Sequence, residues 1–159
     1  DQGLAVAKFR VQGGQPSDDV IVDDGDPGFV RGGTASRWHE ASVGYNMHMY
    51  WTENTQLIPD NWSTWTPNLL KPGFYEVYAY IPTLFGNARG VRYYAFYDGR
   101  TWSIKALDQS LYFNQWASLG IWRFKADGTE FVYLTDATQQ PAGTEHVAFD
   151  ALKFVFRGP

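Results

Sequence analysis

The clearest alternation of apolar and polar positions lies in residues 71–82, where it follows the turn signal Pro72-Gly73. Successive side chains of a β-strand point to opposite faces, so this segment predicts a strand with two different faces. One face would carry the core residues Tyr75, Val77, Ala79 and Ile81. The other would carry Glu76, Tyr78 and Tyr80. Its two tyrosines would form an aromatic strip that is either covered by another element or open to a ligand. Pro82 has no N–H to donate and ends the strand, around which we expect the fold to be assembled.

Shorter runs of the same kind, separated by turn residues, fill most of the chain. They cover residues 20–22, 29–31, 38–41, 44–51, 62–66, 91–97, 102–107, 115–124, 131–135 and 147–156. Asp98-Gly99 is a strong hairpin signal, and no segment has the 3.6-residue period of a helix of any length. About eight to ten short strands at this spacing indicate an all-β protein, and we predict an antiparallel β-sandwich that is jelly-roll-like.

Three of these segments lead to specific expectations. In residues 44–51 we expect Tyr45, Met47 and Met49 to share one strand face. Residues 91–97 carry aromatic side chains on both faces, which favours a strand inside a sheet. We predict that residues 147–156 form one strand in which Asp150 points inward and accepts hydrogen bonds from backbone N–H groups.

The domain organisation follows from a change in pattern near residue 18. We interpret residues 1–18 as an N-terminal arm or linker and residues 19–159 as the β-sandwich domain. Within the arm, a weak strand pattern is followed by the hinge signal Gly13-Gly14. Its apolar residues are Leu4, Val6, Phe9 and Val11. This strand could complete its own sandwich or be donated to another molecule.

Composition narrows the classes of function. The chain has 159 residues, enough for one stable domain, and it lacks cysteine, which excludes disulfides and thiolate metal sites. A net charge of -4, with 13 Lys and Arg spread along the chain, argues against a nucleic-acid partner. No apolar run approaches the ~20 residues that span a bilayer. Aromatic residues make up 18% of the chain, which is typical of an aromatic-rich β protein.

Two groups of residues raise the question of a metal. Asp23, Asp24 and Asp26 lie in one loop, but the loop lacks the bidentate Glu of an EF-hand, and we interpret them as turn residues that bond their own backbone. Calcium binding by this loop stays an open alternative. His39 and His48 have no pattern of further ligands, so we expect hydrogen-bonded or surface histidines. We therefore predict no metal and no cofactor.

Aromatic residues beside polar loops suggest a binding surface. The indole face packs well on the C–H groups of a sugar ring, and an alternative role is that of a lid over the end of the core. We expect Trp65 to lie in the core instead, because it sits within a strand. The predicted ligand-binding residues are Tyr50, Trp51, Trp62, Tyr112 and Asn114.

Four short motifs, in order along residues 19–156, resemble the golvesin C-terminal-like domain, also described as a xanthan lyase carbohydrate-binding-like domain. They are Val20–Asp24 with Gly28-Phe29, Pro72–Val77, Trp116–Gly120 with Phe124, and Phe149–Phe154. The resemblance implies a β-sandwich that is attached to, or secreted with, bacterial extracellular enzymes and surface proteins and that binds glycans. Residues 48–65 look longer than is usual for the family.

Together with this resemblance, which implies a secreted or cell-surface location, the sequence favours a non-catalytic module that binds a glycan or cell-surface polysaccharide. Motifs for nucleophilic or metal-dependent catalysis are missing, so we expect no enzyme. One alternative is a small glycan-active enzyme that uses two carboxylates, for which the candidates are Glu40, Glu53, Asp60 and Glu76. The other is a structural subunit of a surface assembly, joined by self-association through residues 1–14.

Overall fold

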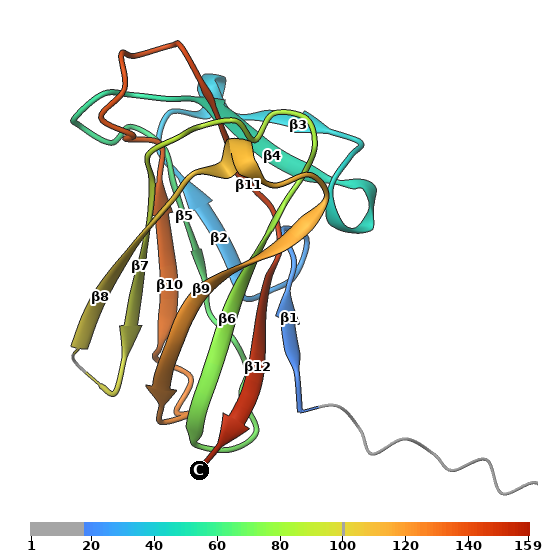
Figure 1. The fold of residues 1–159 in the computed structure, drawn as a ribbon, viewed down its shortest axis with the longest axis vertical. Helices are drawn as coiled ribbons and strands as arrows, with labels where there is room; N and C mark the ends of the chain where they lie inside the picture. The colour runs from blue at the N-terminus through green and yellow to red at the C-terminus, as the bar shows by residue number, and fades with distance from the viewer. Residues whose placement is uncertain (1–17, 100) are drawn as a thin grey trace, which may run out of the picture.

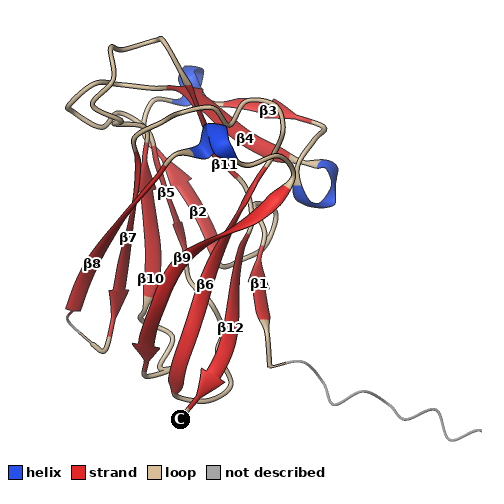
Figure 2. Ribbon diagram, in the orientation of Figure 1, coloured by secondary structure: helices blue, strands red, loops and turns tan. Residues whose placement is uncertain are grey.

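The computed structural model describes residues 18–99 and 101–159 and shows two antiparallel sheets packed face to face, with a small third sheet across one end (Figures 1 and 2). The first sheet contains, in spatial order, β1 (Val20–Val22), β12 (Leu152–Gly158), β6 (Gly73–Ile81) and β9 (Gln115–Phe124). The second contains β2 (Phe29–Gly32), β5 (Trp62–Trp65), β10 (Phe131–Thr135), β7 (Val91–Tyr97) and β8 (Thr101–Leu107). The third contains β11 (His146–Phe149), β4 (Met49–Glu53) and β3 (His39–Ala41). The predicted all-β sandwich is confirmed.

Helical structure in the described residues is limited to three single 3₁₀ turns: η1 (Ala35–Arg37), η2 (Tyr45–Met47) and η3 (Gln109–Leu111). Among the same residues, no helix is long and apolar enough to cross a membrane. The predicted arm, including residues 1–14, lies outside the described part of the chain.

Strand β6 is the centre of the first sheet, as predicted. It pairs with β12 on one side and β9 on the other, and its alternate residues are buried. Tyr75, Val77, Ala79 and Ile81 are all at most 1% exposed. Opposite them, Trp65 of β5 is fully buried, and its indole N–H donates to the carbonyl of Asp150 over 2.9 Å. Trp65 is therefore a core residue, as expected.

Strand β7 lies between β10 and β8, which confirms the prediction of an interior strand. Asp98 and Gly99 both have positive φ in the turn that follows, the backbone conformation that the Asp-Gly signal indicates. Strands β9 and β10 have the predicted bounds.

Residues 44–51 depart from prediction. Tyr45–Met47 form the turn η2, and Asn46 and Met47 have positive φ, so the strand β4 begins only at Met49. Tyr45, Met47 and Met49 therefore do not share a strand face. Asn tolerates the left-handed region well. The turn brings the backbone of Tyr45 to the carboxylate of Asp150. The alternation of apolar and polar residues in 44–51 does not indicate this long-range contact.

Residues 147–156 form parts of two strands, whereas the sequence predicted one. β11 ends at Phe149 and belongs to the third sheet, whereas β12 begins at Leu152 and belongs to the first. Asp150 stands at the break between them, 3% exposed. The expectation of an inward carboxylate is correct, and Tyr45 of η2 donates its backbone N–H to it.

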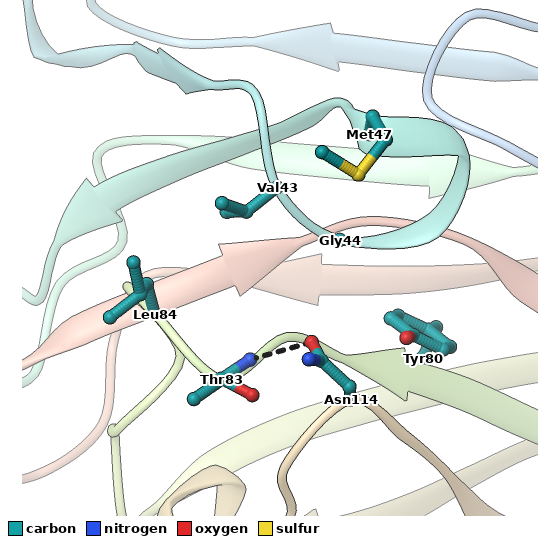
Figure 3. A pocket seen from close by; sticks show the side chains of 7 residues that line it. All are labelled: Val43, Gly44, Met47, Tyr80, Thr83, Leu84 and Asn114. Carbon is teal, nitrogen blue, oxygen red and sulfur yellow. Dashed lines mark hydrogen bonds between the residues drawn. The ribbon is translucent and has the colours of Figure 1, made fainter.

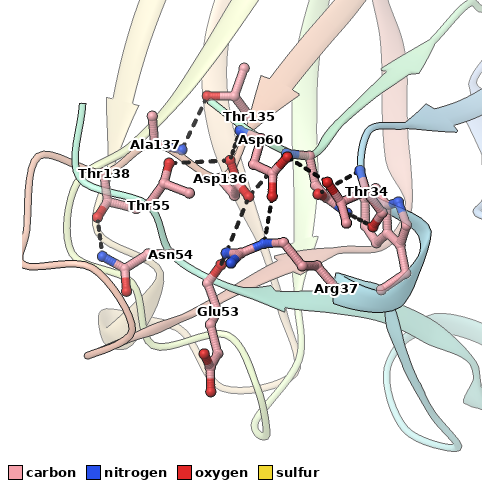
Figure 4. A network of polar contacts seen from close by, with 12 residues as sticks. Thr34, Arg37, Glu53, Asn54, Thr55, Asp60, Thr135, Asp136, Ala137 and Thr138 are labelled. Carbon is pink, nitrogen blue, oxygen red and sulfur yellow. Dashed lines mark hydrogen bonds and ion pairs between the residues drawn. The ribbon is translucent and has the colours of Figure 1, made fainter. Parts of the chain in front are cut away.

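A buried polar network holds the loop between β4 and β5 against the end of the second sheet (Figure 4). The carboxylate of Asp136 accepts the backbone N–H groups of Asp60 and Asn61 over 2.9 and 3.0 Å. Arg37 lies 2.9 Å from Asp60, and Asn54 bonds to Thr138 over 2.8 Å. Asn54, Asp60 and Asn61, polar residues of this long loop, therefore have structural roles.

Candidate functional site

A surface cavity of about 540 Å³ lies at the end of the first sheet (Figure 3). Residues from the β3–η2 connection and from η2 itself form one side. The end of β6, the segment after it and the residue before β9 form the other. The lining residues are Val43, Gly44, Met47, Tyr80, Thr83, Leu84 and Asn114.

The cavity is largely apolar, with a few polar groups at one edge. Met47 and Leu84 expose most of their surface, 69% and 53%. On the polar edge, Asn114 has a positive φ of 50°, and its side-chain Oδ1 accepts the backbone N–H of Thr83 over 3.0 Å. This bond ties the segment before β9 to the one after β6, so the amide of Asn114 has a defined position in the wall. Apolar walls with a small number of oriented polar groups are typical of small-ligand sites.

Tyr80 connects the cavity to a cluster of aromatic rings. Its ring centroid lies 5.2 Å from that of Trp116, its partner on β9, and 5.8 Å from that of Tyr45 in η2. Tyr45 and Trp116 are 5.4 Å apart, so the three rings are in mutual contact. Burial raises the pKa of Tyr80 above its usual value, with the charge of Asp150 as a second cause. Tyr80 therefore stays a neutral phenol that can donate a hydrogen bond.

Beyond this cluster, the outer face of the first sheet carries charged side chains beside the tyrosine strip. The ammonium of Lys153 lies 4.5 Å from the ring centroid of Trp116 and 5.2 Å from that of Tyr78. Arg157 lies 2.8 Å from Glu76 and 2.9 Å from the hydroxyl of Tyr78. The strip that the alternation of β6 predicted, Glu76, Tyr78 and Tyr80, is partly exposed and continues from the cavity as a partly polar surface.

A group of buried carboxylates lies directly behind the cavity wall. One oxygen from each of Asp23, Asp24 and Asp150 lies within 4.8 Å of the others. Burial raises the pKa of Asp150 to about 8, although the N–H of Tyr45 opposes the shift. Burial likewise raises the pKa of Asp24 to about 7, because the loss of hydration outweighs its contact with His48. Sequence reasoning placed Asp23 and Asp24 in one loop but could not bring Asp150 to them.

Of the predicted ligand-binding residues, Asn114 lines the cavity and the other four lie elsewhere. Trp51 is stacked between His39 and Phe85, with ring centroids 4.2 and 4.6 Å away, so both faces of its indole are covered. Tyr50 packs parallel to Phe29, and the guanidinium of Arg31 lies 4.2 Å from its ring centroid.

The two remaining members of the predicted set are also partly buried. Trp62 lies against Gly32, where an added Cβ would come within 2.4 Å of the indole, and 6.1 Å from the ring centroid of Tyr133. Tyr112 packs on the edge of the core. The structure thus does not bring Tyr50, Trp51, Trp62 and Tyr112 to the cavity that contains Asn114.

The histidines and carboxylates considered for metal binding or catalysis lie outside the cavity. His39 stacks on Trp51, and Nδ1 of His48 lies 2.7 Å from Asp24. Asp60 pairs with Arg37 and Glu76 with Arg157. Glu40 and Glu53 are exposed. No Asp, Glu, His, Lys or Arg occurs among the residues that line the cavity.

Sequence reasoning missed two members of the aromatic cluster, Tyr45 and Trp116. The alternation in β6 did indicate Tyr80 as a residue of the outer face. Trp116 could have been found from the same pattern, because it is the cross-strand neighbour of Tyr80 once β6 and β9 are paired. Tyr45 could not, since its position depends on the turn η2.

Two comparisons relate the chain to known proteins. It is similar in structure to a xanthan lyase from Paenibacillus, with a TM-score of 0.72 and 27% sequence identity. The match covers 87% of this chain and 13% of the lyase, so the chain corresponds to a small part of that protein. No curated protein sequence is significantly similar to the chain. The profile of the Golvesin C-terminal domain matches residues 20–156, and the chain therefore belongs to the Golvesin C-terminal domain family.

Proposed function

We propose that this domain is a non-catalytic carbohydrate-binding module and that it binds glycans at the cavity beside Tyr80. The observation that carries the proposal is the combination, in one hollow, of an aromatic ring, the oriented amide of Asn114 and aliphatic walls. Sugar rings present C–H groups for aromatic faces and hydroxyl groups for amides, so this combination suits them. The rings of Trp116 and Tyr45 extend the apolar surface next to Tyr80.

The family membership and the likeness to a xanthan lyase support a role connected with polysaccharides. Xanthan is for that reason the first polysaccharide to test. The same relationship supports a secreted or surface location, where such polymers are found.

The chemistry of the cavity supports binding without catalysis. General acid–base catalysis of glycoside cleavage needs titratable groups next to the scissile bond, most often a pair of carboxylates. The described residues that line the cavity include none, and two of the candidate carboxylates, Asp60 and Glu76, are paired with arginines. A glycan bound in the cavity would therefore meet no carboxylate or histidine of the lining residues.

Affinity electrophoresis and calorimetry of the full chain with xanthan and a panel of neutral and acidic polysaccharides test the proposal. We expect weak binding to at least one polymer and a loss of about five- to tenfold for Tyr80→Ala, because one aromatic contact contributes on the order of 1 kcal/mol. Asn114→Gly keeps the positive φ and removes the amide, and should weaken binding as well.

Trp102→Ala is the matched control, since Trp102 is 52% exposed on β8 of the second sheet and does not line the cavity. It should bind like the wild type. Equal binding by Tyr80→Ala and the wild type, both folded by circular dichroism, would place the site elsewhere. Progressive loss of viscosity of a polysaccharide in the presence of the chain would overturn the non-catalytic part of the proposal.

A further inference from the structure

Three segments that are distant in sequence meet at the carboxylate group behind the cavity. Asp23 and Asp24 follow β1, and Asp150 stands between β11 and β12. Tyr45 and Asn46 of η2, and His48 directly after it, contact these carboxylates. All three carboxylates are buried, with Asp23 8%, Asp24 6% and Asp150 3% exposed. Carboxylates are almost never fully buried unless they are paired.

One carboxylate oxygen in this group lacks a hydrogen-bond donor. Asp23 accepts the side-chain N–H of Asn46, and Asp24 contacts His48. Oδ2 of Asp150 accepts the N–H of Tyr45, and the backbone N–H of Ala151 also favours the charged carboxylate. The Oδ1 atom is buried, however, and no donor reaches it within hydrogen-bond geometry. A buried carboxylate oxygen without a donor is costly, and such an atom calls for an explanation such as an ion.

The charges around the group are also unbalanced. Among the described residues, no Lys or Arg forms an ion pair with any of the three carboxylates, and His48 is their single basic contact. A divalent cation between them would reverse this situation.

We propose that Asp23, Asp24 and Asp150 bind a calcium ion. Calcium prefers oxygen ligands at about 2.3–2.6 Å, so two oxygens on opposite sides of the ion lie about 4.6–5.2 Å apart. The three carboxylate oxygens lie within 4.8 Å of one another, which fits around such an ion. Its coordination sphere of six to eight oxygens can be completed by second carboxylate oxygens and by water.

The position of the ion links it to the cavity wall. The ion would tie the end of β1 to the β11–β12 junction, and η2 is bonded to both through Asn46 and Tyr45. Gly44 and Met47, next to these residues, line the cavity. Calcium would therefore hold one wall of the cavity in place, whatever ligand the cavity binds.

Calcium binding by the full chain, without any polysaccharide, tests the inference. After treatment with EDTA and its removal, calorimetry with Ca²⁺ alone should show one site. The melting temperature should rise by roughly 5–10 °C when Ca²⁺ reaches a hundredfold excess over its Kd. Asp150→Asn should weaken binding at least tenfold and lose this rise, because it removes a charged ligand with little change of shape.

Asp26→Asn is the matched control. Asp26 belongs to the same loop as Asp23 and Asp24 but lies outside the group, and its side chain only accepts the N–H of Asp23, which an Asn oxygen can also do. It should bind Ca²⁺ like the wild type. If Asp150→Asn fails to fold, Asp24→Asn provides the same test.

Two results would overturn the inference. A wild type that neither binds Ca²⁺ at millimolar concentration nor melts at a higher temperature in its presence would mean that protons alone neutralise the group. Binding that is lost in Asp26→Asn and kept in Asp150→Asn would assign the ion to the loop by itself. Neither result bears on glycan binding, which is measured separately.

Discussion

The carboxylate of Asp150 accepts a hydrogen bond from the backbone N–H of Tyr45, 105 residues earlier in the chain, over 2.9 Å. The contact joins the break between β11 and β12 to the turn η2. Because Tyr45 also touches Tyr80 and Trp116, the same bond positions one ring of the aromatic cluster. One buried acid thus connects the fold of the sandwich to its candidate binding site.

Gly44 permits this contact, and replacing it should destabilise the domain. Its φ is 88°, and a Cβ at this position would lie 2.2 Å from Oδ2 of Asp150. We expect Gly44→Ala to lower the free energy of unfolding by about 1–3 kcal/mol, from backbone strain and from displacement of the carboxylate. Urea unfolding measures the change. The control is Gly25→Ala, where nothing lies within 4 Å of the added Cβ, and a change of the same size there would contradict this explanation.

Trp51→Ala should reduce stability and leave glycan affinity unchanged. The indole is stacked between His39 and Phe85, so its loss opens a gap between the third sheet and the segment that carries Phe85. We expect a cost of roughly 1–3 kcal/mol, less than for a fully buried Trp. Thermal unfolding and polysaccharide binding are measured on the same sample. Weaker binding at unchanged stability would favour the original hypothesis that Trp51 is a sugar platform.

The pH dependence of stability should report the contacts of Glu76. The Ser118 hydroxyl, followed by Tyr78 and Arg157, lowers the pKa of Glu76 below its ordinary value. A lowered pKa in the folded state contributes stability that is fully present above the unfolded value of about 4.3 and is lost as the pH falls through the folded value. The stability difference between the wild type and Ser118→Ala should therefore shrink between pH 6 and pH 3 in urea unfolding. For Ser42→Ala, an exposed control, the difference should not change with pH.

Deleting residues 1–14 should leave the sandwich folded. Among the described residues, a continuous core runs from Val22 to Phe154, and β1 pairs with β12. We expect a melting temperature within about 2 °C of the full chain. Light scattering of both forms tests the alternative of self-association. Loss of an assembly on deletion, and its return with added arm peptide, would support strand donation through residues 1–14.

The local sequence pattern was sufficient to predict regular strands whose two faces differ in polarity. The alternation of residues 71–82 predicted β6 and its buried face, and Asp98-Gly99 predicted a turn with two positive φ angles. Trp65, inside a strand, was placed correctly in the core. In each case the physical cause lies within a few residues, because the side chains of a strand alternate and because a tight turn needs particular residue types.

Long-range contacts decided the rest. A bulge between β6 and β9 shifts the register near Gly120, so Ala117 and Leu119 face the core but Ile121 does not. Asp150 divides an apolar run between two sheets, and its carboxylate meets Asp23 and Asp24 only through the pairing of β1 with β12. Phe85 and His39 cover Trp51 from two other segments. Such arrangements depend on which strands pair and where loops cross them. Neither property produces a periodic pattern in the local sequence, so neither could be predicted from it.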